Sequence, residues 1–365
     1  MRVVQLYFPG PFGGAEQVIL YGSEALARQG LEVSVIVVQE TRRPAFVEIF
    51  KERADSLNIE TKKLISKGRL DLTLLLKLKA LLKETNPHIV HAHCHKAAFY
   101  GLLCKPKRAR FVYTSHGFFP DASLKCKIYT AIEIYVMRRS GRVIAVSQSL
   151  KRELVHGNVP SDIISVLENF LPVVAKGRKV TGNDKMNLLF VGRLTKRKGC
   201  HHLISAISKI MDKINVELTI VGDGKERKSL AQMVSDLKLD AIVKFEGFKN
   251  DVSRFLKKCD ALIFPSLKEG FPIVLIEACC SGVPILSSNI EPAQQIVRDG
   301  VNGILFAPGS AKSIASAILL FNEDKQAYLS RSKRMANGFM KRFDRLSWAR
   351  CMKNIYMDLV CHKRR

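Results

Sequence analysis

The sequence lacks any long uninterrupted run of apolar residues, and this absence limits the classes of protein to which it can belong. A membrane-spanning helix needs about 20 consecutive apolar residues, whereas every apolar stretch here is strand-length or interrupted by Lys and Arg. No signal peptide is evident, because Met1 leads directly into an apolar strand. The 9 cysteines are odd in number and lack the spacing of a disulfide framework, which indicates a reducing compartment. We therefore expect a cytoplasmic protein.

Acidic residues are scarce compared with basic ones. The chain has 33 Asp and Glu against 59 Lys and Arg, a formal net charge of +26 at pH 7. Such a positive field attracts nucleic acid, anionic lipid headgroups or phosphorylated substrates, and charge alone does not choose among them. A nucleic-acid-binding protein would interleave aromatic side chains with Lys and Arg. The aromatic residues here mostly fall in strands and turns, so we expect no nucleic-acid partner.

The alternation of apolar segments predicts an α/β fold in two domains. A chain of 365 residues is too long for one ordinary core, and short strands alternate with helical patterns nearly throughout. We expect two Rossmann-like, doubly wound domains facing each other across a cleft, residues 1–170 and 186–343, with a linker at 171–185. The predicted strands are 2–7, 32–38, 88–91, 111–115 and 143–146, then 186–192, 217–221, 243–246, 261–264 and 284–287.

Two glycines and a histidine follow predicted strands of the first domain, where open α/β sheets bind ligands. Gly13 and Gly14 precede an amphipathic helix predicted over 17–29, so the backbone there can approach a phosphate. The pattern is not GxGxxG, and a tight structural turn explains it about as well. His116 leaves a strand and is a candidate to hydrogen-bond a sugar or polarise a leaving group. A partly buried structural histidine is the alternative.

Three alternating histidines, His91, His93 and His95, share one face of an extended chain and suggest a metal site. A zinc site would need a further ligand arrangement, and no acidic partner is nearby. We therefore favour packing at the strand end and predict no metal.

Basic side chains follow the first strand of the second domain. Arg193 comes directly after Gly192, and Lys198 lies in the same short loop. The planar fork of arginine and the compact charge of lysine together suit a diphosphate. The Walker pattern GxxxxGK[ST] is absent, which argues against ATP hydrolysis. Gly222 ends the next strand in a turn, where a structural role is clear and a ribose or base contact is less well supported.

The most informative segment is 265–277. A strand runs into a loop carrying Glu269, and the chain turns at Gly270 and Pro272 into an apolar helix that contains Glu277. Free N–H groups at a helix start bind anions, whereas carboxylates accept hydrogen bonds from hydroxyls. A nucleotide sugar offers both phosphate and hydroxyls. The paired acids of a glycosidase are the rival interpretation.

In these motifs the sequence resembles glycosyltransferase family 4, a large retaining family with the GT-B fold. The resemblance covers nearly the whole chain, and its specific core is the pair Glu269 and Glu277 with seven residues between them. A departure is Glu168-Asn169-Phe170, where many relatives carry Asn-Gly. Supporting matches are Gly13-Gly14-Ala15-Glu16, Ala145-Val146-Ser147, Val191-Gly192-Arg193 with Lys198, Val221-Gly222-Asp223-Gly224 and Asn302-Gly303.

The resemblance implies a role for each matching position. Arg193 and Lys198 would hold the donor diphosphate, and Glu277 would hydrogen-bond the ribose. Glu269 would grip the transferred sugar, and His116 would touch that sugar near the reacting carbon. The predicted catalytic residues are His116, Glu269, Arg193 and Lys198, and the predicted donor-binding residues are Gly13, Gly14, Gly192, Arg193, Lys198, Gly222, Glu269, Gly270, Phe271, Pro272, Ile273 and Glu277.

The same resemblance implies the overall activity. We expect retaining, metal-independent transfer of a sugar from a UDP-sugar or GDP-sugar to a polysaccharide or lipid-linked acceptor, in the synthesis of lipopolysaccharide, capsule or exopolysaccharide. No cofactor is expected beside this nucleotide-sugar co-substrate. Residues 344–365 resemble the family's C-terminal helix, which crosses back onto the first domain. The alternatives are a sugar-nucleotide epimerase or hydrolase on the same fold and, with less support, a basic nucleic-acid-binding protein.

A basic, leucine-rich stretch at residues 62–83 bears on the surroundings of the protein. It alternates Lys with Leu, and an amphipathic basic segment can lie on an anionic membrane. That interpretation predicts peripheral binding to the inner face of the plasma membrane. An ordinary solvated helix packed through its leucines explains the pattern equally well.

Overall fold

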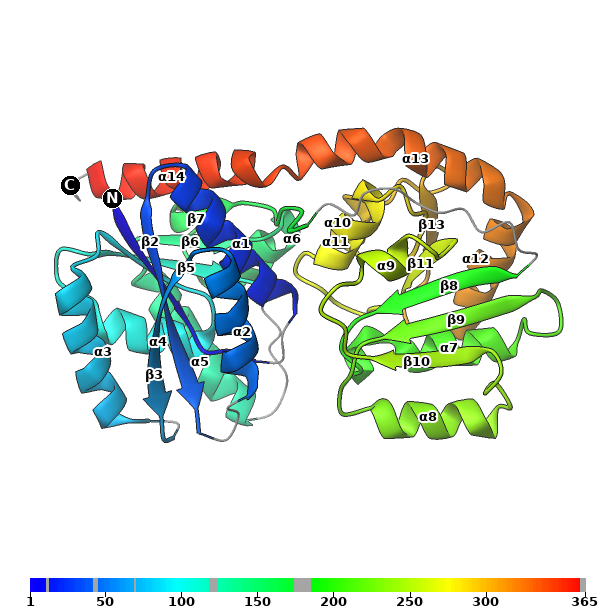
Figure 1. Cartoon of the computed structure of the whole chain (residues 1–365), viewed down its shortest axis with the longest axis horizontal. Coiled ribbons are helices and arrows are strands. Elements are labelled where there is room, and N and C mark those ends of the chain that lie inside the picture. The colour runs from blue at the N-terminus through cyan, green and yellow to red at the C-terminus, as the bar shows by residue number, and fades with distance from the viewer. Residues whose placement is uncertain (11–12, 42–44, 69, 118–123, 174–184, 362–365) are drawn as a thin grey trace. The chain divides into compact units, whose positions relative to one another are not determined.

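The structure of the chain, a computed structural model, consists of two compact units (Figure 1). Unit 1 comprises Met1–Pro172 and Asp344–Arg365, and unit 2 comprises Val173–Phe343. The structure describes all residues except 11–12, 42–44, 69, 118–123, 174–184 and 362–365. Most of the predicted linker thus lies outside the described residues.

Unit 1 is built on a seven-stranded sheet in which every strand pairs in parallel with its neighbours. The strand order is β3-β2-β1-β4-β5-β6-β7, so the order reverses between β1 and β4. In such sheets the loops on either side of this switch point leave the carboxyl edge open to a ligand. The strands are β1 (Arg2–Tyr7), β2 (Glu32–Glu40), β3 (Glu60–Ser66), β4 (Ile89–Ala92), β5 (Arg110–Ser115), β6 (Arg142–Ala145) and β7 (Ile164–Val166).

Helices cover both faces of this sheet (Figure 1). Helices α1 and α2 connect β1 to β2 and β2 to β3, on one side of β1 in the sheet, whereas α4 and α5 connect β4 to β5 and β5 to β6, on the other side. Because crossovers between parallel strands are right-handed, connections in opposite directions place their helices on opposite faces. The helices are α1 (Gly14–Arg28), α2 (Ala45–Ser56), α3 (Leu72–Thr85), α4 (His95–Cys104), α5 (Leu124–Arg138), α6 (Gln148–His156) and α14 (Arg345–Cys361), with a 3₁₀ turn η1 (Ser161–Ile163).

The C-terminal helix α14 belongs to the core of unit 1. It packs against α1, and its Met352 and Tyr356 are buried with Val3 of β1 and Val112 of β5. Trp348, at the start of this helix, lies over Phe170, with ring centroids 4.7 Å apart. Burial of these apolar surfaces stabilises the unit, so residues from the far end of the chain complete the first hydrophobic core.

Unit 2 has a six-stranded parallel sheet in the order β10-β9-β8-β11-β12-β13. This is the doubly wound 3-2-1-4-5-6 order of a Rossmann fold, with its switch point between β8 and β11. The strands are β8 (Met186–Val191), β9 (Val216–Val221), β10 (Val243–Gly247), β11 (Ala261–Phe264), β12 (Ile285–Ser288) and β13 (Gly303–Phe306). The helices are η2 (Lys196–Lys198), α7 (Cys200–Ser208), α8 (Arg227–Asp236), α9 (Ser253–Leu256), α10 (Ile273–Cys280), α11 (Glu291–Gln294), α12 (Ala311–Glu323) and α13 (Lys325–Arg342).

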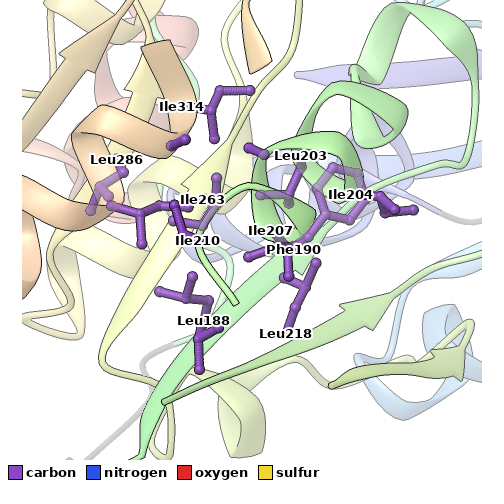
Figure 2. Close-up of a cluster of buried hydrophobic side chains, with 14 of the residues drawn as sticks. Leu188, Phe190, Leu203, Ile204, Ile207, Ile210, Leu218, Ile263, Leu286 and Ile314 are labelled. Atoms are coloured by element: carbon purple, nitrogen blue, oxygen red, sulfur yellow. The ribbon is translucent and has the colours of Figure 1, made fainter. Parts of the chain in front are cut away.

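One continuous apolar cluster holds unit 2 together. Figure 2 shows Phe190 of β8 among side chains of α7, and Ile263 of β11 near Leu286 and Ile314; Leu188 of β8 belongs to the same cluster. All of these side chains are 1% exposed or less. The amphipathic pattern of α7, with Leu203, Ile204 and Ile207 buried, places that helix on the sheet through its apolar face.

The predicted fold class, two Rossmann-like doubly wound domains, is confirmed for each unit. All ten predicted strands are present, with ends that differ by two residues at most, and α1 begins at Gly14 rather than at 17. The prediction missed β3, β7 and β13. The basic stretch at 62–83 is not one element, because it divides between the edge strand β3 and helix α3. β3 has one buried residue among seven and carries Lys62 and Lys63, so its apolar pattern is weak.

We expect Gly22→Val to destabilise unit 1. A Cβ at Gly22 would lie 2.9 Å from Cη2 of Trp348, so a valine must displace the indole ring from α1. Overpacking of this kind costs about 1–3 kcal/mol. Trp348 is the one tryptophan of the chain, so a urea titration followed by its fluorescence reports on unit 1.

Gly338→Val is the matched control for this prediction. Gly338 lies within α13 of unit 2, and a Cβ there meets nothing within 4 Å. The control should leave the urea midpoint reported by Trp348 unchanged. An unchanged midpoint for Gly22→Val would contradict the contact between α1 and the indole.

Candidate functional site

The loops after β8 and β11, at the switch point of unit 2, are joined backbone to backbone. The amide of Leu267 donates a hydrogen bond to the carbonyl of Arg197 at 2.8 Å. Gly199 has φ +68°, and a Cβ there would lie only 2.1 Å from the carbonyl oxygen of Pro265. No other residue fits this position without moving the backbone. The close approach fixes the two loops relative to each other.

This approach brings Lys198 and Glu269 together. Lys198 Nζ lies 2.7 Å from Glu269 Oε1, and the two side chains are 15% and 11% exposed. The two groups form a close ion pair, in which the ammonium of Lys198 is directed at one oxygen of the Glu269 carboxylate. The ammonium also lies 5.7 Å from the centroid of Phe264, within cation–π range. Two predicted catalytic residues are thus in direct contact.

Arg193 lies exposed in the same loop as Lys198. Among the described residues, its guanidinium has no carboxylate partner. Gly222 has φ +136°, and a Cβ there would lie 2.0 Å from the carbonyl oxygen of Gly192. These two predicted donor-binding glycines therefore have a packing role of their own: they let the loops after β8 and β9 touch at the residue before Arg193.

The predicted helix mouth forms as expected. Helix α10 begins at Ile273, and Pro272 precedes it as the N-cap residue. Gly270 is buried, and the ring of Phe271 packs at 6.0 Å from that of Phe343. Phe271 and Ile273 are 5% and 7% exposed, so these side chains support the helix start from inside unit 2, and a ligand could meet mainly their backbone.

Glu277 lies in the second turn of α10 and is half-buried. Burial, and to a smaller extent the negative charge of Asp251, raises the pKa of its carboxyl from 4.5 to about 8. The side chain is therefore mostly protonated at neutral pH. A protonated carboxyl both donates and accepts hydrogen bonds, which suits a partner that carries hydroxyl groups.

In unit 1 the paired glycines stand at the start of α1. Gly13 is the N-cap residue, and its amide donates to the carboxylate of Glu16 at 2.9 Å. That carboxylate also accepts a hydrogen bond from the hydroxyl of Tyr7. Gly14 is the first helical residue. An anion at this helix end would have to share the region with Glu16, a competition that the sequence pattern did not reveal.

His116 lies just beyond β5 and is half-buried. Its Nε2 lies 3.4 Å from Nδ1 of His93, which follows the neighbouring strand β4. Nε2 of His93 in turn lies 2.6 Å from Oε1 of Gln5 on β1. Burial lowers the pKa of His116 from 6.5 to about 4, so the ring is neutral at physiological pH.

The three alternating histidines do not converge on one point. The rings of His91 and His93 lie 4.2 Å apart, whereas His95 opens helix α4 and packs against Tyr129 at 5.7 Å. Across the part of the chain that the structure describes, no group of three or more His, Cys, Asp or Glu side chains could hold a metal ion.

Two residues of the histidine cluster were missed from the sequence. Gln5 was assigned only to a strand, and Tyr356 only to the C-terminal stretch. Yet Tyr356 Oη lies 2.6 Å from His91 Nδ1 and 3.5 Å from Gln5 Nε2, although these residues are 265 and 351 positions away from it in the sequence. No local pattern signals such pairs. A polar residue in an otherwise apolar strand, as Gln5 is in β1, was the one available clue.

A basic pocket lies at the opposite edge of the unit 1 sheet. Arg2, Arg110 and His88 line it at the amino ends of β1, β5 and β4, together with Arg108. It is therefore distinct from the carboxyl edge, where Gly14 and His116 lie.

Sequence profiles of two families match the chain in succession. The profile described as Glycosyltransferase Family 4 matches residues 12–173, and the one described as Glycosyl transferases group 1 matches residues 175–338. The first match falls on unit 1 and the second on unit 2. Together they include every strand of both sheets except β1, and all of the predicted site residues.

Known proteins of similar sequence and fold agree with these matches. The UDP-Gal:alpha-D-GlcNAc-diphosphoundecaprenol alpha-1,3-galactosyltransferase of Escherichia coli is 28% identical over 323 residues, 80% of this chain and 81% of its own. The lipopolysaccharide core biosynthesis glycosyltransferase LpsE of Rhizobium meliloti is 27% identical over 375 residues, the full length of both. The crystal structure of Anabaena HepE with UDP-glucose has a TM-score of 0.82 at 22% identity and covers 97% of this chain and 99% of its own.

Two parallel Rossmann-like units of this kind define the GT-B glycosyltransferases. The chain belongs to glycosyltransferase family 4. No helix among the described residues is long and apolar enough to cross a membrane.

The raised pKa of Glu277 predicts a pH-dependent stability of unit 2. Between pH 4.5 and about 8 the folded protein holds a proton that the unfolded chain has released. The free energy of unfolding then falls as pH rises, by up to about 1.4 kcal/mol per pH unit. The stabilisation that comes from the proton on Glu277 is complete below about pH 4.5 and is lost as the pH rises through about 8. Glu277→Gln removes it, so urea midpoints of the variant, measured by circular dichroism from pH 5 to 8, should fall less than those of the wild type.

The control is Glu246→Gln, which changes an exposed carboxylate in β10 of the same unit. It should retain the pH dependence of the wild type. Parallel curves for Glu277→Gln and the wild type would show that Glu277 is ionised in the folded protein.

Proposed function

We propose that this glycosyltransferase moves a sugar, with retention of configuration and without a metal ion, from a UDP-sugar or GDP-sugar to a lipid-linked or polysaccharide acceptor. The observation that carries the proposal is the contact between Lys198 and Glu269 at the switch point of unit 2. It sets a cation for phosphate beside an acceptor for hydroxyl groups, the two kinds of partner that a nucleotide sugar requires.

The cations act on the leaving group. Arg193 binds the diphosphate through its planar fork, and Lys198 neutralises the charge that develops as the bond from phosphate oxygen to sugar breaks. Lys198 is already held in place by the carboxylate of Glu269, and a bound diphosphate would contact the same ammonium. Arg193 has no acidic partner among the described residues, so its charge is available to the diphosphate. These two side chains supply the positive charge that a metal ion provides in other transferases.

The carboxyl groups recognise hydroxyls. The carboxylate of Glu269 is held by the ammonium of Lys198 through one oxygen, and its remaining lone pairs can accept a hydrogen bond from a hydroxyl of the transferred sugar. The amides of Gly270 and Phe271, next to it, bind the same sugar. Glu277, protonated at neutral pH, binds the ribose as both donor and acceptor. His116 contacts the donor sugar near the reacting carbon.

We further propose that retention results from attack on the face that the leaving group departs from. The acceptor hydroxyl attacks the anomeric carbon, the bond to the phosphate oxygen breaks, and that oxygen takes the hydroxyl proton. No carboxylate nucleophile is required. The nucleoside diphosphate leaves with the electron pair, stabilised by Arg193 and Lys198.

The acceptor class is supported by the relatives. One acts, by its name, on a sugar linked to diphosphoundecaprenol, and another serves lipopolysaccharide core biosynthesis. We propose the same general class for this protein: a growing cell-surface glycan, as in lipopolysaccharide, capsule or exopolysaccharide.

Substitutions in the basic pair should separate binding from chemistry. Arg193→Ala and Lys198→Ala each remove a charge-assisted contact worth about 1.5–3 kcal/mol, so affinity for UDP or GDP should fall about 10–100-fold. Glu269→Ala should reduce sugar transfer about 100-fold or more, with a milder loss of nucleotide affinity. Calorimetry measures the affinities, and product analysis with and without acceptor measures transfer against hydrolysis.

Lys196→Ala is the control, because Lys196 is exposed in the same loop and carries the same charge. Its nucleotide affinity should remain within about twofold of the wild type. Undiminished nucleotide affinity in both Arg193→Ala and Lys198→Ala would refute the proposal that these two residues bind the diphosphate.

A surface of unit 1 supports peripheral binding to an anionic membrane. Leu70, just before α3, and Leu72 and Leu76, in the first two turns of α3, are 79%, 76% and 71% exposed. We call these three residues the leucine patch. The buried face of the same helix is formed by other leucines, at 74, 78 and 82. Packing therefore does not account for the patch, and exposed lysines at 77, 79 and 83 surround it with positive charge.

We expect Leu72→Ser with Leu76→Ser to weaken binding to vesicles that contain phosphatidylglycerol by about tenfold or more, because each buried leucine contributes about 1.5–3 kcal/mol. Sedimentation with vesicles at low salt measures this binding, and added salt should weaken it further. Leu320→Ser, at a 50% exposed leucine of unit 2, should bind as the wild type does. If the wild-type protein does not sediment with these vesicles at low salt, the proposed binding to an anionic membrane is refuted.

A further inference from the structure

A chain of hydrogen bonds at the carboxyl edge of unit 1 ends at His116. It runs from Gln5 on β1 to His93 after β4 and then to His116 after β5. These three strands are neighbours in the sheet, so their ends lie side by side. Each link joins one donor to one acceptor, and the chemistry of the first link therefore decides the rest.

The first link fixes the proton on His93. Gln5 Oε1 lies 2.6 Å from His93 Nε2, and Gln5 Nε2 lies 3.5 Å from the hydroxyl of Tyr356. An amide oxygen can only accept a hydrogen bond. His93 must therefore donate from Nε2, and this nitrogen carries the proton.

The second link follows from the neutrality of His93. The side chain is 7% exposed, and burial, followed by the nearby His91 and His116, holds its pKa well below 6.5. A neutral imidazole with a proton on Nε2 has a bare Nδ1. That nitrogen lies 3.4 Å from His116 Nε2, so His116 must donate to it.

The last residue of the chain then presents an acceptor. His116 is also neutral, because burial lowers its pKa to about 4. With its proton on Nε2, its Nδ1 is bare. Among the described residues, no group hydrogen-bonds to this Nδ1.

We propose that Gln5 and His93 are positioning residues that hold His116 in the Nε2–H tautomer, so that its bare Nδ1 accepts a hydrogen bond from a hydroxyl of the donor sugar. This inference rests on the proposed function, in which His116 contacts that sugar. In the opposite tautomer His116 would present an N–H there, which can donate to the hydroxyl oxygen but offers the hydroxyl proton no acceptor. Losing one such hydrogen bond lowers the rate of transfer about tenfold.

His91 stands outside this chain although its ring packs on that of His93. Its Nδ1 lies 2.6 Å from Tyr356 Oη and its Nε2 lies 2.7 Å from Thr114 Oγ1. Both nitrogens are therefore occupied, and His91 serves the packing of unit 1. Thr114→Val consequently alters a buried hydrogen bond of the same cluster without touching Gln5, His93 or His116.

The test is a long-range ¹H–¹⁵N spectrum of the free, full-length protein with ¹⁵N-labelled histidine, in which the signals of His116 are identified by their loss in His116→Asn. We expect a protonated Nε2 and a bare Nδ1. Gln5→Glu keeps the shape of residue 5 and places a carboxylate beside His93, which favours a charged ring that donates from both nitrogens. His116 should then switch its proton to Nδ1. Thr114→Val should leave the tautomer as it is.

A protonated Nδ1 in the wild type, or an unchanged tautomer in Gln5→Glu, would overturn the inference. A second experiment compares kcat for sugar transfer between the wild type and the variants. Gln5→Glu and His93→Phe should lower kcat about tenfold with UDP or GDP affinity within about twofold, and Thr114→Val should not. A switched tautomer with unchanged kcat would overturn the positioning role. If the wild type transfers no sugar from any UDP-sugar or GDP-sugar, the proposed function fails while the spectrum still decides the tautomer.

Discussion

Hydrogen bonding between parallel strands decides where the functional side chains of this protein lie. Because all strands of each sheet run in one direction, their carboxyl ends share an edge, and the reversal of strand order opens that edge to a ligand. Lys198 and Glu269 follow the adjacent strands β8 and β11, and His93 and His116 follow the adjacent strands β4 and β5. The order of the strands therefore decides which functional side chains of each unit lie next to one another.

In each unit, the enclosed candidate groups carry little net charge, in a protein whose total charge is +26. Lys198 and Glu269 neutralise each other, burial keeps Glu277 protonated, and burial keeps His116 uncharged at neutral pH. Isolated charges away from water are costly, so enclosed groups are paired or neutral. Such groups hydrogen-bond hydroxyls without a large desolvation penalty, and the exposed Arg193 remains for a phosphate. This division agrees with a ligand that has both a charged and a hydroxylated part.

Much of the fold was predictable because strands leave a strong local pattern. Central strands such as β1 and β11 are buried on both faces and read as short apolar runs, and all ten that were predicted are present. The edge strand β3 was missed, since an edge needs fewer apolar residues and this one carries two lysines. β7 has only three residues, too few to show a period, and β13 begins at Gly303, a residue type that is depleted in strands. The helix mouth at Pro272 was predicted correctly, because proline and glycine act on their own backbone.

The sequence by itself determined the class of fold, the family and the residue types that follow each strand, since these depend on local patterns and ordered motifs. Only the tertiary structure decided which of those residues meet. Lys198 contacts Glu269 because Gly199 lets two loops touch, and His116 gains its partner His93 through the pairing of β4 and β5. Gln5 and Tyr356 join the same cluster across 351 positions. Such contacts, and the proton positions that follow from them, arise from strand register and helix packing, which no local stretch of sequence encodes.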